Sequence, residues 1–270
     1  MEKRTNKWNQ TGRILLLAVI CTVLWGSAFP SIKLGYEWFE IAPQDIPAKI
    51  LFAGYRFFLA GIFTILAGVI SSRKWLCPTR QNIGVISLLG LVQTGLQYLL
   101  FYIGLSNTTG VKGAILSATG AFIAVILAHF FYRDDRLTVR KILGCLAGFG
   151  GVVLLNASGG ELLGGFSFFG EGFMMLSAAS FAVGSLISKR AAQMGDPVTI
   201  TGYQLLIGGG ALILAGILSG GRLMAVSVKG IALLGYLALL SAVAFVLWTL
   251  LLKYNPVGKI SVYNFLTPIF

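Results

Sequence analysis

The chain has 270 residues, of which 56% are hydrophobic and 11% are charged. A soluble domain carries about 25% charged residues, so this composition excludes an ordinary soluble protein and indicates a membrane protein. The formal net charge of +12 does not indicate a nucleic-acid-binding protein, because the basic residues are concentrated in alternate loops between apolar stretches.

Apolar stretches of about twenty residues recur along the whole chain and predict membrane-spanning α-helices. The segments between them are too short to hold a soluble domain. The first stretch is too long for a signal peptide, so we expect it to be retained as the first helix. Helices are predicted at residues 14–35, 47–70, 82–105, 109–132, 140–156, 168–188, 198–219 and 229–252, and a ninth is predicted to begin near Gly258.

Basic residues predict the orientation in the membrane. The N-terminal tail, residues 1–13, shares one side with the loops that are richest in Lys and Arg, whereas the opposite loops carry only Lys49, Lys112, Arg222 and Lys229. The positive-inside rule therefore predicts a multi-pass protein of the cell membrane with a cytoplasmic N-terminal tail.

An internal repeat is visible when residues 52–71 (FAGYRFFLAGIFTILAGVIS) are aligned with residues 200–219 (ITGYQLLIGGGALILAGILS). Glycines at a spacing of seven residues are shared by the two copies: Gly54, Gly61 and Gly68 in the first, and Gly202, Gly209 and Gly216 in the second. Small residues at such a spacing let two membrane helices approach closely.

The repeat divides the chain into two halves, residues 14–156 and 168–270, with an extracytoplasmic linker at 157–167. A complete half would contain five helices, and repeats with an odd number of helices insert in opposite orientations. We therefore expect an all-α polytopic membrane protein of two inverted five-helix repeats. Residues 258–270 would form a helix only about 20 Å long, shorter than the hydrocarbon core of about 30 Å. We expect the tenth helix to be missing from this chain.

The first helix carries an unusual stretch, LWGSAFPSIKLG, at residues 24–35. Pro30 cannot donate a hydrogen bond to the carbonyl of Gly26, which frees the helix to bend. Trp25 offers a broad apolar face with one donor, and Ser27 is small and polar. The stretch is typical of a helix that lines a cavity, although a packing kink with an interfacial tryptophan is the alternative.

The third helix contains a polar stripe in the sequence LVQTGLQYLLFYIG. Gln93 and Gln97 are four residues apart and share one helix face, with Tyr98 nearby. Buried amides are costly unless they meet water or a partner. The stripe either faces a central cavity or forms a hydrogen bond between helices for packing.

Two further residues carry charge or can titrate. Arg56 lies inside the second predicted helix and aligns with the neutral Gln204 in the repeat. An arginine inside a membrane-spanning helix suggests a functional role, and a structural pairing with neighbouring backbone carbonyls is the alternative. His129 is the only histidine and lies near the cytoplasmic end of the fourth predicted helix. A histidine in this position is expected to have no specific functional role.

Catalytic and cofactor motifs are absent from the sequence. It contains no H-E-x-x-H, no G-x-S-x-G and no phosphate-binding loop, and no Cys/His spacing indicates a metal. No Asp or Glu falls in the middle of a predicted helix. We therefore expect no enzyme activity, no cofactor, no metal and no carboxylate-based proton site.

Several stretches resemble the EamA-type family of the drug/metabolite transporter superfamily. Their order and spacing carry the resemblance over essentially the whole chain: LWGSAFPSIKLG, YRFFLAG, LSNTTGVKGAIL, LTVRKILGCLAGFGGVVLL, GEGFMMLSAASFAVGSLISKRAA and YNPVGKISVYNFLTPIF. The resemblance implies ten helices in two inverted repeats, cytoplasmic termini, and export or exchange of small metabolites. The chain departs from the family at Gly120, where proline is frequent, and in YRDDRLT, which replaces a Gly-Glu-Arg run.

The resemblance also implies a central substrate-binding cavity between the two halves. Mapped onto this sequence, its lining is Trp25, Ser27, Gln93, Gln97, Tyr98, Ser117, Ser177, Phe181, Trp248, Tyr263 and Asn264.

These observations lead to a secondary transporter that exports or exchanges small organic metabolites, amino-acid-like or drug-like, by alternating access. An uncoupled facilitator is the alternative within transport, and a membrane-embedded enzyme or a scaffold protein are alternatives from other classes. The expected partners are a small-molecule substrate and the lipid bilayer, with no nucleic acid, in a monomer or homodimer.

Overall fold

The computed structural model describes residues 10–156, 165–223 and 227–270, and these residues form helices and connecting turns without a strand. The prediction of an all-α protein is thereby confirmed. The predictions for the cytoplasmic tail and for the linker fall largely on residues 1–9 and 157–164, which lie outside the described residues.

Seven helical spans in the described part of the chain are long and apolar enough to cross a membrane. They are α1 (Thr11–Trp38), α2 (Ile46–Ser72), the continuous span of α3 (Ile83–Leu89) and α4 (Gln97–Ser106), α5 (Gly110–Phe131), α7 (Phe173–Gln193) with the turn before it, α8 (Pro197–Leu218) and α9 (Val228–Tyr254). The remaining elements are α6 (Val139–Asn156), α10 (Val257–Ser261) and a 3₁₀-helical segment (Val262–Ile269).

The sequence explains where α2 and α8 begin. The side chain of Asp45 accepts a hydrogen bond of 2.9 Å from the backbone nitrogen of Ala48, and Asp196 accepts one of 2.9 Å from that of Thr199. A proline follows in the first turn of each helix. Both helices therefore start with an acidic N-cap and a proline, the residues that best tolerate the unpaired first turn.

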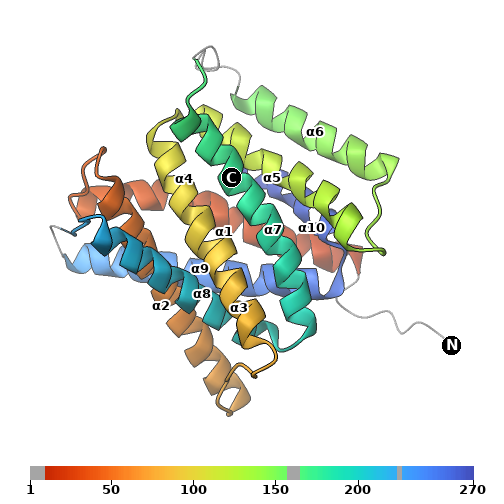
Figure 1. Cartoon of the computed structure of the whole chain (residues 1–270), viewed down its shortest axis with the longest axis horizontal. Helices are drawn as coiled ribbons and strands as arrows, with labels where there is room; N and C mark the ends of the chain where they lie inside the picture. Colours follow the sequence, from red (N-terminus) through yellow and green to blue (C-terminus); the bar gives the residue numbers. More distant parts are fainter. Residues whose placement is uncertain (1–9, 157–164, 224–226) are drawn as a thin grey trace.

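The α2 and α8 helices lie against each other along the glycines of the repeat, at one end of the molecule in Figure 1. A Cβ atom added at Gly54 would lie 2.6 Å from the backbone nitrogen of Ile213. One added at Gly61 would lie 2.7 Å from the backbone nitrogen of Leu206. These distances leave no room for a side chain, so the glycines bring the two backbones into contact.

The third span is not a uniform α-helix. Residues Gly90–Leu96 form a π-helical stretch between α3 and α4. Carbonyl groups in and next to this stretch accept hydrogen bonds from two serines of α7: Ser180 Oγ donates to the carbonyl of Val92 at 2.8 Å, and Ser177 Oγ donates to that of Gln97 at 2.9 Å. A π-helical stretch changes the direction of the side chains beyond it and is frequent at functional sites.

The two halves of the chain are interleaved. The α1 helix packs on α9, α2 on α8, and α5 on α7, so each of these contacts joins the first half to the second. The α6 helix lies at the edge of the bundle beside α5 (Figure 1). Helices of both halves consequently contact one another throughout the bundle.

Candidate functional site

An aromatic cluster occupies the middle of the bundle. The ring of Trp25 in α1 lies 5.0 Å from that of Trp248, 5.8 Å from that of Phe245 and 6.2 Å from that of Phe181, measured between centroids. Three of these four residues, all except Phe245, were expected at the cavity from the sequence. Phe245 is three residues before Trp248 and shares its helix face, which is the signal that could have found it.

Tyr98 extends the aromatic cluster on the side of α2. Its ring lies 4.2 Å from that of Phe57, and Phe57 in turn lies 6.1 Å from Phe245. The aromatic cluster, defined as Trp25, Phe57, Tyr98, Phe181, Phe245 and Trp248, therefore draws side chains from both halves of the chain.

Gln93 is buried and takes part in a hydrogen bond between helices. Gln204 Nε2 in α8 donates to Gln93 Oε1 at 2.9 Å and lies 3.4 Å from Thr94 Oγ1. This contact is the packing alternative that the sequence left open for the polar stripe. The Nε2 atom of Gln93 and the Oε1 atom of Gln97 are buried and have no hydrogen-bond partner among the described residues.

The other expected residues are distributed around this core. Ser177 bonds the backbone of α4 as described above, and Ser27 Oγ donates to the carbonyl of Leu24 at 2.9 Å and lies 3.5 Å from Tyr236 Oη. Tyr263 is half-buried and packs against a buried cluster that includes Trp248. Asn264 is half-buried in the 3₁₀-helical segment, whereas Ser117 is exposed on α5.

Arg56 is buried in α2, with 2% of its surface exposed. Its Nε donates to Ser241 Oγ at 2.8 Å, and its guanidinium carbon lies 4.9 Å from the centre of the Phe57 ring. Arg56 stands out in the sequence, but its role was left open there, and Ser241 was not predicted. A single serine in an apolar helix carries no signal until its partner is known.

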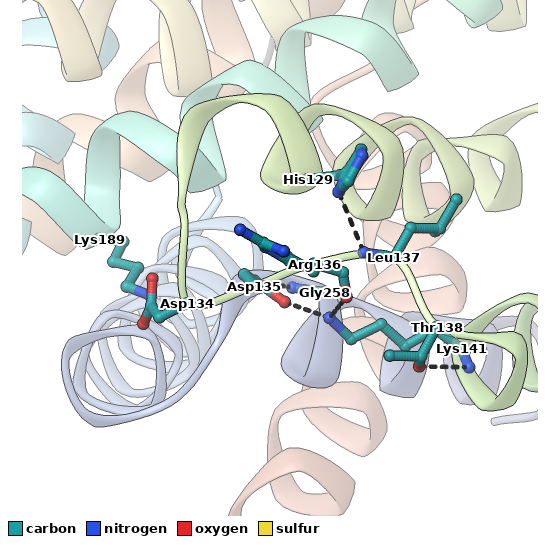
Figure 2. Close-up of polar contacts among 9 residues, drawn as sticks. All are labelled: His129, Asp134, Asp135, Arg136, Leu137, Thr138, Lys141, Lys189 and Gly258. Carbon is teal, nitrogen blue, oxygen red and sulfur yellow. Dashed lines mark hydrogen bonds and ion pairs between the residues drawn. The ribbon is translucent and has the colours of Figure 1, made fainter.

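Charged residues join the two halves at the C-terminal ends of α5 and α7 (Figure 2). Asp135 is fully buried, and its carboxylate accepts from the backbone nitrogen of Gly258 at 2.8 Å and from Lys141 Nζ at 2.5 Å. Lys189 Nζ lies 3.5 Å from Asp134 Oδ2. The Asp pair of YRDDRLT thus contacts both α7 and α10 of the second half.

A second set of charged contacts lies at the N-terminal ends of the same two helices. Glu171, just before α7, forms an ion pair of 3.0 Å with Lys112 in the first turn of α5. Thr108 Oγ1 donates to Glu171 at 2.8 Å, and the backbone nitrogen of Ser167 donates at 2.7 Å. The α5 and α7 helices therefore run parallel, with one ion pair at each end.

A basic pocket of about 660 Å³ opens beside Asp134. Its charged lining is dominated by Arg133, Arg136, Arg140, Lys141 and Lys259. Tyr263 also lines the pocket, and it packs against a buried cluster that includes Trp248.

The described residues contain no group of three His, Cys, Asp or Glu side chains that could hold a metal ion. Cys21 and Cys145 are buried free thiols, and Cys77 is an exposed one. Apolar spans, buried amides and an aromatic cluster shared by the two halves define the class, a polytopic membrane protein with some polar side chains buried among apolar ones.

Comparison with known proteins identifies the family. The sequence model of the EamA-like transporter family matches residues 12–157 and 168–270, so the chain belongs to this family and is a membrane transporter. The family and the names of the relatives indicate a transporter rather than an enzyme.

The relatives include proteins from several kingdoms. An uncharacterized transporter of Archaeoglobus fulgidus is 28% identical, over 94% of this chain and 85% of its own length. A WAT1-related chloroplast protein of Arabidopsis thaliana is 26% identical over 91% of this chain, which spans 59% of that protein. The transporter YvbV of Bacillus subtilis is 26% identical over 76% of this chain and 63% of its own length. A solved crystal structure with 18% sequence identity shares the fold, with a TM-score of 0.77 over 96% of this chain and 86% of that one.

Proposed function

We propose that this protein is a secondary transporter that exports or exchanges small organic metabolites across the cell membrane by alternating access. The observation that carries the proposal is the pair of charged contacts at the two ends of α5 and α7. Phe181 of the aromatic cluster lies between them on α7. A binding region flanked by two separable closures is what alternating access requires, because each closure can open while the other stays shut.

Two repeats of opposite orientation, residues 14–156 and 168–270, fit this proposal. Aligning the repeats exchanges α1 with α7, α2 with α8, the α3–α4 span with α9, and α5 with residues 257–269. The α1–α9 contact then corresponds to the α7–α4 contact, and the α5–α7 contact corresponds to that of α1 with the 3₁₀-helical segment. The α2–α8 contact corresponds to itself. The separate family matches to residues 12–157 and 168–270 further support two repeats.

The central site of the proposal combines the aromatic cluster with Gln97, Ser177, Ser27, Tyr263 and Gln93. The unpaired Oε1 of Gln97 and the indole Nε1 atoms of Trp25 and Trp248 are buried without a partner among the described residues. Buried polar atoms without a partner are costly, and a bound solute would satisfy them. Aromatic faces with a few polar atoms suit amino-acid-like or drug-like solutes.

An uncoupled facilitator is the second candidate. The buried acidic residues in the described part of the chain, Asp135 and Glu171, lie at helix ends rather than in mid-membrane. A carboxylate relay through the centre of the membrane is therefore not favoured, and exchange without ion coupling is consistent with this arrangement.

Solute counterflow in proteoliposomes tests the proposal. The purified full chain is reconstituted with a panel of amino acids and organic metabolites inside, and uptake of the labelled form of each is followed. We expect saturable exchange for some members and its loss in Trp248→Ala, because Trp248 contributes a large buried face to the cluster. Leu214→Ala, at an exposed apolar position of α8, is the matched control. No saturable exchange for any member would refute the proposal.

Accumulation against a gradient separates the two candidates. A coupled transporter concentrates its solute when a proton or sodium gradient is imposed, whereas a facilitator only equilibrates it. Equal final concentrations on both sides under every imposed gradient would favour the facilitator.

A further inference from the structure

Arg56 lies deep in the membrane-spanning part of α2. The helix begins at Ile46, so at a rise of 1.5 Å per residue Arg56 is about 15 Å along its axis. An arginine in this position keeps its charge and loses most of its hydration. Its burial therefore requires compensation from neighbouring groups.

The neighbours of Arg56 compensate its charge only in part. Ser241 accepts from Nε, and the Phe57 ring lies under the guanidinium. The phenol groups of Tyr36, Tyr98 and Tyr102 lie within its electrostatic reach. All of these groups are uncharged. The ion pairs found among the described residues involve lysines at the helix ends, and none includes Arg56.

Arg56 also adjoins the aromatic cluster. Its partner Ser241 shares one face of α9 with Phe245 and Trp248, at spacings of four and seven residues. Its ring neighbour Phe57 contacts both Tyr98 and Phe245. The guanidinium is therefore a cationic end to an otherwise apolar and aromatic site.

The basic pocket supplies an independent observation on charge. Five of its lining residues are Arg or Lys, and Asp134 is the acidic member. A concave surface of one charge sign raises the local concentration of ions of the opposite sign. The pocket would therefore gather anions at the surface that Tyr263 also lines.

We infer that Arg56, positioned by Ser241, binds the carboxylate of the transported solute, and that the solute is a small organic acid or a zwitterionic amino acid with an apolar body. The inference rests on the proposed function. Arg56 uses its Nε for Ser241, and the planar fork of a guanidinium can hold both oxygens of a carboxylate. The apolar body of the solute packs on the aromatic cluster. A cationic amine without a carboxylate is disfavoured by repulsion from Arg56.

Binding of matched ligand pairs to the purified full chain tests the inference. The probes are 3-phenylpropionate and 3-phenylpropanamide, phenylalanine and phenylalaninamide, and leucine and leucinamide. Binding is read from the fluorescence of the tryptophans, two of which are in the cluster, and from the shift in the melting temperature. We expect the wild type to bind at least one carboxylate about tenfold or more tightly than its amide.

The variants separate recognition from a structural role. Arg56→Gln introduces the residue that the second repeat carries at the aligned position, Gln204. We expect it to reduce the affinity for 3-phenylpropionate to that for 3-phenylpropanamide and to leave binding of this neutral amide unchanged. Arg56→Lys should retain part of the preference, since the charge remains without the planar fork. Arg80→Gln removes the same charge at an exposed position and serves as the control.

Several outcomes would overturn the inference. These are equal binding of acids and amides by the wild type, no binding of any carboxylate, a preference that survives Arg56→Gln, or equal loss of both ligands with a lowered melting temperature. Counterflow of the same ligands distinguishes this failure from failure of the proposed function. Carboxylate-selective binding without exchange would refute transport and leave the site intact, whereas exchange of acids and amides at equal rates would refute the site alone.

Discussion

The amide of Gln93 meets the amide of Gln204 from another helix, and both side chains are buried. Gln93→Leu would leave Gln204 buried without its acceptor, which costs about 1–3 kcal/mol. We expect a lower melting temperature for this variant in detergent. The double variant with Gln204→Leu should recover most of the loss, because replacing both partners by apolar groups is nearly neutral.

The exposed Gln81→Ala is the control for this pair and should change the free energy of unfolding by about 0.5 kcal/mol or less. If the double variant is as unstable as the sum of the single ones, the two amides do not act as a pair.

His129 is exposed at the end of α5, and its Nδ1 accepts from the backbone nitrogen of Leu137 at 3.2 Å. This contact supports the turn after α5 (Figure 2). We expect His129→Gln to leave the transport rate and its pH profile between about pH 5 and 8 largely unchanged. A flattened pH profile in this variant would show that His129 carries the proton dependence.

At the scale of elements, the contact between α2 and α8 depends on individual glycines. A Cβ atom at Gly209 would collide with the backbone nitrogen of Phe58, whereas one at the neighbouring Gly210 would lie 3.9 Å from the edge of the Phe58 ring. Gly209→Ala should therefore force the helices apart and destabilise the protein by about 1–3 kcal/mol.

Gly210→Ala is the matched control, because it adds the same methyl group to the same helix in ordinary contact distance. This variant should leave the free energy of unfolding unchanged or raise it by about 0.5–1 kcal/mol, since alanine has a higher helix propensity than glycine. Thermal unfolding in detergent compares the two variants, and similar melting temperatures would contradict close backbone packing at Gly209.

At the scale of the whole molecule, the two sets of charged contacts should act as opposing closures. Asp135→Asn weakens the contacts to Lys141 and Gly258, so the side at the C-terminal ends of α5 and α7 should open more often. We expect a cysteine at Tyr263, in a Cys77→Ser background, to react faster with a polar maleimide when Asp135→Asn is added. Glu171→Gln weakens the opposite closure and should slow the reaction. Equal rates in all three proteins would argue against coupled closures.

The orientation of the molecule can be tested through a native side chain. Cys77 is exposed in the loop between α2 and α3, which the positive-inside rule predicts to be cytoplasmic. An impermeant maleimide should label Cys77 only after the cells are permeabilised. Lys229→Cys in a Cys77→Ser background should be labelled in intact cells. The reverse pattern would invert the predicted topology.

Much of the fold is predictable from hydropathy, because the thickness of the bilayer dictates the length and apolarity of every span. The predicted helix at 47–70 is observed as Ile46–Ser72, and the one at 198–219 as Pro197–Leu218. The close approach of these two helices follows from glycines that are visible in the repeat. The resemblance to the EamA family also led to four members of the aromatic cluster, Trp25, Tyr98, Phe181 and Trp248.

The partners of the polar residues could not be predicted, because they are far apart in the sequence. Gln93 and Gln204 are separated by 111 residues, Asp135 and Gly258 by 123, and Arg56 and Ser241 by 185. Hydropathy places such residues at a depth in the membrane but leaves open which helix faces them. The rotation and packing of the helices decide that, and with it whether a buried amide serves packing and whether an arginine meets a carboxylate or a serine.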